Sequence, residues 1–416
     1  MDFGPSDRVV LLLDRVRAFS EEHVIPLEDE ALAALDDEVQ PGVAYPAVLV
    51  DIRERAKAEG LWNLFLADER YGPGLTTWEY GMLCEEMGRS PVAPMAFNCS
   101  APDTGNAEIL AEHGTDEQRR RWLEPLLEGT IRSCFSMTEP ETSGSDPTCL
   151  AARAELVSGE WVITGHKWFT SGYNGAEVAI AMVVTDPDAA PHSRASMICV
   201  PLDTPGFRGI RPVPVMGHEG GPGHWEVRYE GARVPEGNLL GPRGACFTIA
   251  QDRLGPGRIH HCMRAIGSAE RAFELMCVRA HARQAFGGKL ADTQFVQDFV
   301  AKSRMEIDSA RLMVLRAAWK MDTGGKRVAR QDISMIKVIA AQMHQEVLDR
   351  AMQVHGALGM SDDVPLALAW RQGRGLRIAD GPDEVHKATI ARRELDRFKH
   401  EEAPAERNGA PRETAA

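Results

Sequence analysis

Two long apolar stripes in the C-terminal half limit the possible folds of this chain more than any other feature. Mostly apolar residues recur there at steps of three and four: Val296, Val300, Ser303, Ile307, Ala310, Val314 and Ala317 in the first stripe, and Ile333, Ile336, Ala340, Met343, Val347, Ala351 and Val354 in the second. This spacing places each set on one face of an α-helix, as in an antiparallel helix bundle. Gly324-Gly325 lies between the stripes and predicts a turn. We therefore expect residues 245–400 to form a helix bundle.

The preceding segments predict two further domains. Residues 1–130 contain apolar residues at helical spacing, as in "DRVVLLLDRVRAFSEEHVIPLE", and predict an all-helical domain. Residues 131–244 contain short β-branched and aromatic runs, such as "EWVITGHKWFTSG" and "EVAIAMVVTD", and predict a β domain. Residues 401–416 are polar and rich in Pro and Gly, which predicts a disordered tail.

Composition excludes some classes of function. The 416 residues include 44% hydrophobic residues, enough for a large core, and their net charge of -14 argues against nucleic acid as the main partner. Eight scattered cysteines without a CxxC pair are expected to be reduced thiols of a cytoplasmic protein. The N-terminus does not resemble a signal peptide, and no apolar run approaches the ~20 residues of a membrane span.

One acidic residue lies at a break between two expected helices. In "RIADGPDEVHKATIARREL", Gly381-Pro382 predicts a turn, and a new helix is expected to begin directly after it. Asp380 therefore lies on the break. The pattern alone is compatible with a chemical role or with a cap on the following helix, for which Asp383 is also available.

Six motifs in this order resemble those of the acyl-CoA dehydrogenase family. They are "CFSMTEPETSGSD", "ITGHKWFTSG", "MGHEGGPGHWEVRYEGARVPEGNLLG", "RQAFGGKLADTQ", "QVHGALGM" and "ADGPDEVHKATIARREL". The resemblance covers roughly residues 10–398 and is strongest to a long-chain-type subgroup. It implies an α+β multidomain fold with an N-terminal helical domain, a middle β-barrel or sandwich, and a C-terminal four-helix bundle.

The resemblance also implies FAD, bound between the β domain and the bundle. The residues of this chain that would contact it are Phe135, Met137, Thr138, Ser143, Gly144, Ser145, Phe169, Thr170, Ser171, Pro382, Asp383 and Glu384. The loop "TEPETSGSD" has one residue more than the common family pattern, so Ser143 and Ser145 are both candidates for the pyrophosphate. Phe169 replaces the family's usual Trp and keeps a flat apolar side chain. No GxGxxG fingerprint follows a strand, so a Rossmann site is not expected.

A second set of residues would reach the FAD of a neighbouring subunit. This set comprises Arg283, Phe286, Gln294, Gln353, Val354, His355 and Gly356. A guanidinium suits phosphate oxygens, so Arg283 is expected to pair with the pyrophosphate. The resemblance therefore implies a homodimer or a dimer of dimers.

The implied reaction is the α,β-dehydrogenation of an acyl-CoA to a trans-2-enoyl-CoA, as in fatty-acid β-oxidation. A base removes the α-proton while the β-hydride passes to flavin N5. We expect Asp380 to be this base, because it matches the family's usual Glu, and we expect a dry apolar pocket to raise its pKa. Its backbone N–H is expected to donate to the thioester oxygen. Gly381 would let the acyl chain approach, and Ser145, Arg258 and Arg392 would contact the substrate, with Arg258 at the start of a helix that follows "GPG".

The remaining expectations concern metals, partners and alternatives. His260-His261-Cys262 are consecutive and point to different sides of a helix, so no metal site is expected. The implied electron acceptor is an electron-transferring flavoprotein. Two alternatives stay open: a flavin-dependent acyl-CoA oxidase or monooxygenase on the same scaffold, and a non-catalytic scaffold that binds CoA or lipid. The motifs do not encode the acyl chain length.

Overall fold

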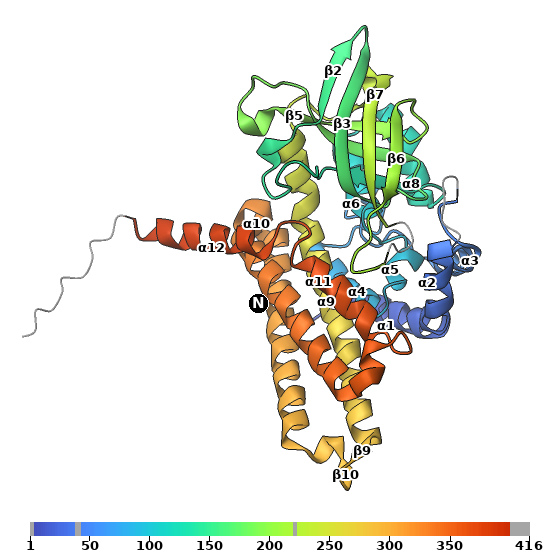
Figure 1. The fold of residues 1–416 in the computed structure, drawn as a ribbon, viewed down its shortest axis with the longest axis vertical. Coiled ribbons are helices and arrows are strands. Elements are labelled where there is room, and N and C mark those ends of the chain that lie inside the picture. The colour runs from blue at the N-terminus through green and yellow to red at the C-terminus, as the bar shows by residue number, and fades with distance from the viewer. Residues whose placement is uncertain (1–3, 38–42, 219–222, 400–416) are drawn as a thin grey trace, which may run out of the picture.

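The computed structural model describes residues 4–37, 43–218 and 223–399, and its elements follow the expected order of helices, β-sheet and helices (Figure 1). The α+β fold class is therefore confirmed. The predicted disordered tail, residues 401–416, lies outside the described residues. None of the described helices is long and apolar enough to cross a membrane.

The N-terminal region is helical. Its α-helices are α1 (Asp7–Phe19), α2 (Glu28–Asp37), α3 (Ala47–Ala58), α4 (Thr77–Gly88), α5 (Ala93–Ala96), α6 (Asp103–His113), α7 (Asp116–Gln118) and α8 (Glu124–Glu128). π-helical turns at Ser20–Val24 and Arg119–Leu123 continue α1 and α7. α4 begins with a complete capping box, in which Thr76 and Glu79 each accept a backbone N–H of the other.

The middle region forms one eight-stranded sheet. Its strands are β1 (Ser133–Ser136), β2 (Arg153–Val157), β3 (Glu160–Ser171), β4 (Val178–Val184), β5 (Ala195–Pro201), β6 (Phe207–Pro212), β7 (His224–Pro235) and β8 (Leu239–Leu240). The order is β6-β7-β3-β1-β4-β5-β8, and β2 pairs with both β3 and β4. β1 is antiparallel to β3 and parallel to β4, with Phe135 opposite Ser171 and Ile180. The strands predicted in the two β-branched runs are confirmed as β3 and β4.

β4 joins the sheet to the helices, because both of its faces are buried. Ile180 and Met182 pack in a core shared with the N-terminal helices, whereas Ala181 and Val183 pack in the core of the sheet. This alternation follows the two-residue period of a strand. The neighbouring strand β1 is therefore held where sheet and helices meet.

The C-terminal region contains the long helices. Its elements are α9 (Cys246–Ala282), β9 (Gln284–Ala285), β10 (Gly288–Lys289), α10 (Gln294–His355), α11 (Leu366–Leu376) and α12 (Asp383–Arg397). α10 carries both apolar stripes and is interrupted at Gly325, whose φ of 75° and ψ of 177° are not helical. Val296 near its start and Val354 near its end lie in one buried cluster, so the two halves of α10 run antiparallel. The turn predicted at Gly324-Gly325 is confirmed.

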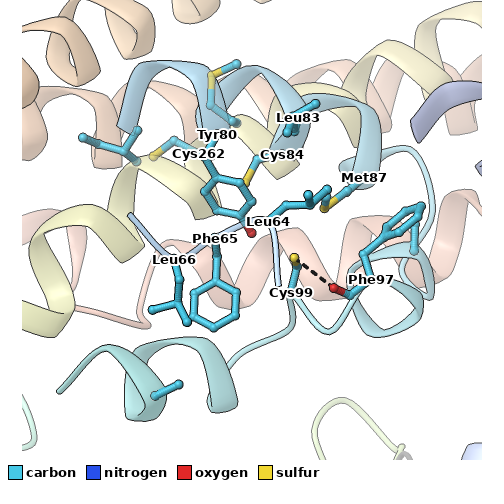
Figure 2. Close-up of a cluster of buried hydrophobic side chains, with 14 of the residues drawn as sticks. Leu64, Phe65, Leu66, Tyr80, Leu83, Cys84, Met87, Phe97, Cys99 and Cys262 are labelled. Carbon is cyan, nitrogen blue, oxygen red and sulfur yellow. Dashed lines mark hydrogen bonds between the residues drawn. The ribbon is translucent and has the colours of Figure 1, made fainter. Parts of the chain in front are cut away.

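The largest buried cluster joins the N-terminal helices to α9 and α10. Figure 2 shows Tyr80 and Cys84 of α4 beside Cys262 of α9, with Cys99 and Phe97 completing the cluster. Through such contacts α9 packs along α4 while its first turns adjoin the β domain (Figure 1). Side chains of α9 are thus available to both the sheet and the bundle.

α9 differs from the sequence expectation at Gly255-Pro256-Gly257. The helix begins at Cys246 and continues through Pro256. Arg258 therefore lies inside α9, and the expectation that it stands at a helix start is wrong. A proline disfavours a helix interior locally, but the buried residues Ile249 before it and Ile259 after it pack in the main core and hold the helix on both sides of Pro256.

Candidate functional site

The candidate site is centred on the loop between α11 and α12. α11 ends at Leu376 and α12 begins at Asp383, so the break predicted at Asp380 is confirmed. Asp380 and Gly381 both have positive φ, at 56° and 102°. A residue with a Cβ rarely adopts this conformation, so the surroundings hold Asp380 under strain. A Cβ at position 381 would also lie 3.0 Å from Nε2 of His386, which explains the glycine there.

Asp380 does not serve as a helix cap. The N-cap position of α12 is Pro382, and no side chain of the described residues caps this helix. Asp383 is buried, and its carboxylate lies 2.9 Å from Nε of Arg377. The Asp380 side chain is 22% exposed, so its carboxylate is reachable and available for another role.

Basic side chains from α9 and α10 face the Asp380 carboxylate. Nε2 of His261 lies 3.5 Å from its Oδ2. Burial lowers the pKa of His261 to about 3, so its ring is neutral at pH 7. Arg253, Lys337 and Arg258 also act on the carboxylate through their positive charges. The site is therefore charged rather than apolar.

The pKa of Asp380 is shifted opposite to the expectation. Burial alone raises the pKa of this carboxyl. The charge that His261 gains in the same acidic range, together with the charges of Arg253, Lys337 and Arg258, outweighs burial and holds the pKa below its ordinary value. The expectation of an apolar pocket that raises the pKa of the base is wrong. A carboxyl group whose pKa is raised lies nearby on α6. Burial raises the pKa of Glu108 to about 8, although the positive charge of Arg253 opposes this shift.

Two of these cations also hold the backbone of the loop. Nζ of Lys337 donates to the carbonyls of Leu376 (2.5 Å) and Ala379 (2.8 Å). Nε of Arg258 donates to the carbonyl of Asp380 (2.9 Å). Arg258, expected to contact substrate, is thus engaged with the loop that carries the expected base.

On the β-domain side, Phe135, Met137 and Thr138 lie at the end of β1. The carbonyl of Met137 accepts from Nζ of Lys167 (2.8 Å), and the carbonyl of Thr138 accepts from the N–H of Trp168 (3.0 Å). The loop after β1 is therefore tied to β3 at two consecutive residues.

A fully buried ion pair supports the same loop. Nζ of Lys167 lies 2.8 Å from Oε1 of Glu139, and their side chains are 0% and 2% exposed. The Glu139 carboxylate also accepts from the N–H groups of Ala151 (2.7 Å) and Ala152 (2.9 Å). Burial opposes ionisation of Glu139, but Lys167 and these bonds prevail and lower its pKa. Such a pair is stable only when its remaining polar atoms are satisfied, as they are here.

Arg253 connects the loop after β1 with Asp380. Its guanidinium carbon lies 4.2 Å from the ring centroid of Phe135, while its charge acts on Asp380. Its Nε is buried without a hydrogen-bond partner among the described residues. The structure thus brings the end of β1 and the α11–α12 loop to one arginine.

Ser143, Gly144 and Ser145 lie in the exposed part of the loop after β1. The two hydroxyl oxygens are 2.9 Å apart. The extra residue in this loop therefore does not separate the two serines in space, and both hydroxyls face the same surroundings. A Cβ at position 144 would lie 3.0 Å from Cγ2 of Thr138, which favours glycine there.

Phe169, Thr170 and Ser171 form the end of β3. The register between β3 and β7 shifts between Lys167 and Thr170, and Phe169 in this bulge has a φ of 48°. A bulge redirects a side chain out of the strand alternation. Phe169 is 39% exposed and Thr170 is buried, while Oγ of Ser171 lies 2.8 Å from Nδ1 of His224.

The second predicted set lies elsewhere in the molecule. Its members Arg283, Phe286, Gln294, Gln353, Val354, His355 and Gly356 occupy the β9–β10 hairpin and the two ends of α10. Figure 1 shows the hairpin at the opposite end of the long helices from the β domain. Within one chain, the structure does not bring this set to the end of β1 or to Asp380.

The residues predicted around α12 are dispersed. Pro382 adjoins the Asp380 loop, and Glu384 is exposed in the first turn of the helix. Arg392 is exposed eight residues after Glu384, which is about 12 Å further along the axis given the rise of an α-helix. The structure therefore does not bring Arg392 to Asp380.

The His260-His261-Cys262 run points in different directions, as expected. The ring of His260 packs edge-on against Tyr80 at 4.6 Å, His261 faces Asp380, and Cys262 belongs to the main core. The three side chains do not converge.

A different group of possible metal ligands lies between α6 and α9. Glu112, His113 and Asp252 have ligand atoms within 4.8 Å of one another. Nζ of Lys326 lies 2.6 Å from Asp252, so a protein cation already partly neutralises this group.

The residues that support Asp380 were not predicted from the sequence. A signal for Lys337 was present, because it follows Ile333 by four positions on the second apolar stripe, where a lone lysine requires a polar partner. The position of Arg253 depends on α9 continuing through Pro256, for which the local sequence gives no sign.

Comparisons with known proteins agree with this architecture. Family models match three consecutive stretches: "Acyl-CoA dehydrogenase, N-terminal domain" over residues 6–130, the middle domain over 134–231, and the C-terminal domain over 244–395. "Probable acyl-CoA dehydrogenase FadE2" of Mycobacterium tuberculosis is 48% identical over 406 residues, which are 96% of this chain and 98% of that protein.

Two further comparisons extend this result. "Acyl-CoA dehydrogenase family member 10" of Mus musculus is 48% identical over 97% of this chain, but the chain spans only 38% of the mouse protein. The structure of a putative acyl-CoA dehydrogenase from Mycobacterium abscessus is 45% identical, with a TM-score of 0.91 over 95% of this chain and 100% of the other. The chain belongs to the acyl-CoA dehydrogenase family, whose members are FAD-dependent oxidoreductases.

Proposed function

We propose that this chain converts an acyl-CoA thioester to a trans-2-enoyl-CoA, with Asp380 as the base that removes the α-proton. The observation that carries the proposal is the α11–α12 loop, which holds a reachable carboxylate in a strained backbone conformation. Strain of this kind persists where the surrounding structure enforces it, as at active sites.

The state of the carboxylate supports this role. Because its pKa lies below the ordinary value, Asp380 is ionised at neutral pH and can accept a proton. The same positive surroundings that weaken it as a base stabilise the negative charge that develops on the thioester oxygen. No backbone carbonyl of the described residues accepts from the backbone N–H of Asp380, which leaves this N–H to donate to that oxygen.

The cofactor is FAD, which supplies the acceptor for the β-hydride when it is bound. Several groups of the β domain fit it. Phe169 offers an exposed flat ring, and the neighbouring hydroxyls of Ser143 and Ser145 offer donors for phosphate oxygens. The indole N–H of Trp168 is buried without a partner among the described residues, as a donor toward a ligand would be.

We also propose that a second copy of the chain completes each FAD site. The β9–β10 hairpin, which Arg283 directly precedes, lies at the opposite end of the long helices from the β domain of its own chain, as Figure 1 shows. Phe286 in this hairpin is fully exposed, and Met305 and Leu312 on α10 are 62% and 51% exposed at a seven-residue spacing that places them on one helix face. Exposed apolar stripes of this kind mark protein interfaces. The assembly is a dimer or a dimer of dimers.

An electron-transferring flavoprotein is the proposed electron acceptor, and the cytoplasm the proposed compartment. All eight cysteines are unpaired, and six of them are buried, which suits a reducing compartment. An acyl-CoA oxidase or monooxygenase on this scaffold differs in using oxygen. The reoxidation step therefore separates these alternatives.

The test is anaerobic titration of the yellow holoenzyme with acyl-CoAs of increasing chain length. We expect one of them to bleach the flavin, and Asp380→Asn to slow bleaching by about 10²–10⁴-fold while the flavin stays bound. Asp363→Asn, which changes an exposed acid near α11, serves as the matched control and should behave as the wild type.

The outcomes discriminate among the candidates. Loss of bleaching in Glu108→Gln but not in Asp380→Asn would assign the base to Glu108. Rapid reoxidation of the bleached enzyme by oxygen would favour an oxidase. A flavoprotein that no acyl-CoA bleaches would contradict the proposed reaction.

A further inference from the structure

We propose that Lys337 is a positioning residue for the base: its ammonium group fixes the two carbonyls that lead into Asp380, while Arg258 fixes the carbonyl of Asp380 itself. The inference rests on the proposed function, because it takes Asp380 as the base. Within the described part of the chain, the hydrogen bonds of Lys337 go to backbone carbonyls and not to the Asp380 carboxylate, so this buried lysine acts by determining where that carboxylate lies.

Lys337 is a lysine in an otherwise apolar position. It is 1% exposed, and the buried residues Ile333, Ile336 and Ala340 lie beside it on the same stripe of α10. Removing an ammonium group from water is costly unless it is paired or fully hydrogen-bonded. Burial accordingly lowers the pKa of Lys337. No carboxylate of the described residues forms an ion pair with it, so its two backbone bonds to the loop are its compensation.

Those two bonds act at the point where the loop leaves α11. The N–H groups of Ile378 and Ala379 both donate to the carbonyl of Gly375, so the helix ends in a tight turn. The carbonyls of Leu376 and Ala379 are left for Lys337, at the helix end where a cation is favourable.

The bonds offset the strain in the loop. The positive φ of Asp380 costs about 1–3 kcal/mol. Hydrogen bonds from charged donors are about twice as strong as neutral ones. Three such bonds, two from Lys337 and one from Arg258, hold the chain on either side of this conformation. Lys337 is the residue through which the described part of α10 donates hydrogen bonds to this loop, so the loop can relax without it.

Lys337 also contributes to the charge around the carboxylate. The titratable groups that face Asp380 are Arg253, Arg258, His261 and Cys262 from α9, Lys337 from α10, and His386 from α12. Burial lowers the pKa of His386 to about 4, and His261 is neutral as well, so the positive charge near neutral pH comes from the two arginines and the lysine. Removing Lys337 therefore raises the pKa of Asp380, an effect that can be measured separately from stability.

The experiment compares Lys337→Met and Lys337→Gln holoenzymes with the wild type. Lys320→Met is the matched control, since Lys320 lies on the same helix and pairs with Asp332 at 2.8 Å, away from the loop. We measure the anaerobic rate of flavin reduction by the best acyl-CoA as a function of pH, and the melting temperature. The protonation of Asp380 is followed by infrared spectroscopy, with its band assigned from Asp380→Asn.

Both Lys337 variants are expected to reduce the flavin about 10- to 100-fold more slowly than the wild type, as expected for a base displaced by about 1 Å. The acid limb of the rate and the infrared titration of Asp380 should both move to higher pH. Lys320→Met should leave both unchanged. If Lys337→Met does not bind FAD, the proposal is tested with Lys337→Gln alone, because glutamine keeps a hydrogen-bond donor but removes the charge.

Two results would overturn the inference. If Lys337→Gln or Lys337→Met loses stability but keeps the wild-type rate and acid limb, while Asp380→Asn is inactive, Lys337 is structural only and the proposed function stands. If no acyl-CoA reduces the wild-type flavin, the proposed function fails and the inference fails with it.

Discussion

At the scale of single residues, the charge on Asp380 determines how the enzyme responds to acid. Its pKa in the folded protein is lower than in the unfolded chain, so its ionised form is favoured on folding. Above the ordinary pKa of ~3.9, Asp380 is ionised and its ionised form contributes fully to stability. Both the ionised base and this contribution are lost as the pH falls through the lowered pKa of the folded protein. We expect substrate-driven flavin reduction to keep a constant rate between about pH 8 and about pH 5. Stopped-flow measurements at saturating acyl-CoA test this; an acid limb centred near neutrality that disappears in Asp380→Asn would contradict it.

Also at the residue scale, the buried pair of Lys167 and Glu139 predicts a large and local stability effect. Lys167→Met leaves the Glu139 carboxylate buried without a counter-charge, which costs about 3–5 kcal/mol. Arg233→Met, which breaks the exposed pair with Glu160, is the control and should cost about 0–1 kcal/mol. Denaturant unfolding of the two variants gives the comparison. Equal free energies of unfolding would show that the buried pair does not stabilise the loop after β1.

At the scale of elements, the reversal of α10 depends on one glycine. Gly325 has a φ of 75° and a ψ of 177°, a region essentially restricted to glycine. Gly325→Ala should therefore destabilise the protein by about 1–3 kcal/mol. Gly375→Ala is the control, because Gly375 is helical in α11 and a Cβ there meets no atom within 4 Å. It should be neutral or stabilising by up to about 1 kcal/mol, and thermal unfolding of both variants tests the difference.

The elements also show what could be predicted from sequence and what could not. The stripes of α10 and the runs of β3 and β4 are periodic over many residues, and they formed as predicted. The start of α9 was misplaced, because core packing overrides the local effect of Pro256. The turn at Asp380 is a local signal and was found. The residues around this turn were not predicted, because they come from distant parts of the chain. The hydrogen bond from Arg258 to Asp380 joins residues 122 positions apart in the sequence, and the bond from Lys337 to Ala379 joins residues 42 positions apart. A charged pocket made by distant segments leaves no local pattern.

At the scale of the whole molecule, the exposed face of α10 predicts assembly. Arginines at both Met305 and Leu312 would place charges on the face proposed to contact a second copy. We expect the double variant to be monomeric by light scattering and to lose FAD, because the hairpin of the partner no longer reaches the site. Val157→Arg, at an exposed apolar position of β2, is the control and should remain an oligomer with FAD. A wild-type monomer that holds FAD fully would refute the proposed completion of the site by a second chain.

The anchoring of the Asp380 loop by Arg258 and Lys337 has a consequence for the order in which the protein folds. The anchors come from α9 and from the second half of α10, and the loop follows both in the chain. Helical turns form locally and quickly, whereas contacts between distant segments must first overcome the entropy of closing long loops. The base can therefore take its working conformation only after the helices have docked. During refolding from denaturant with FAD present, helical circular dichroism should return before substrate can bleach the flavin, so a chain with most of its helices formed is still inactive.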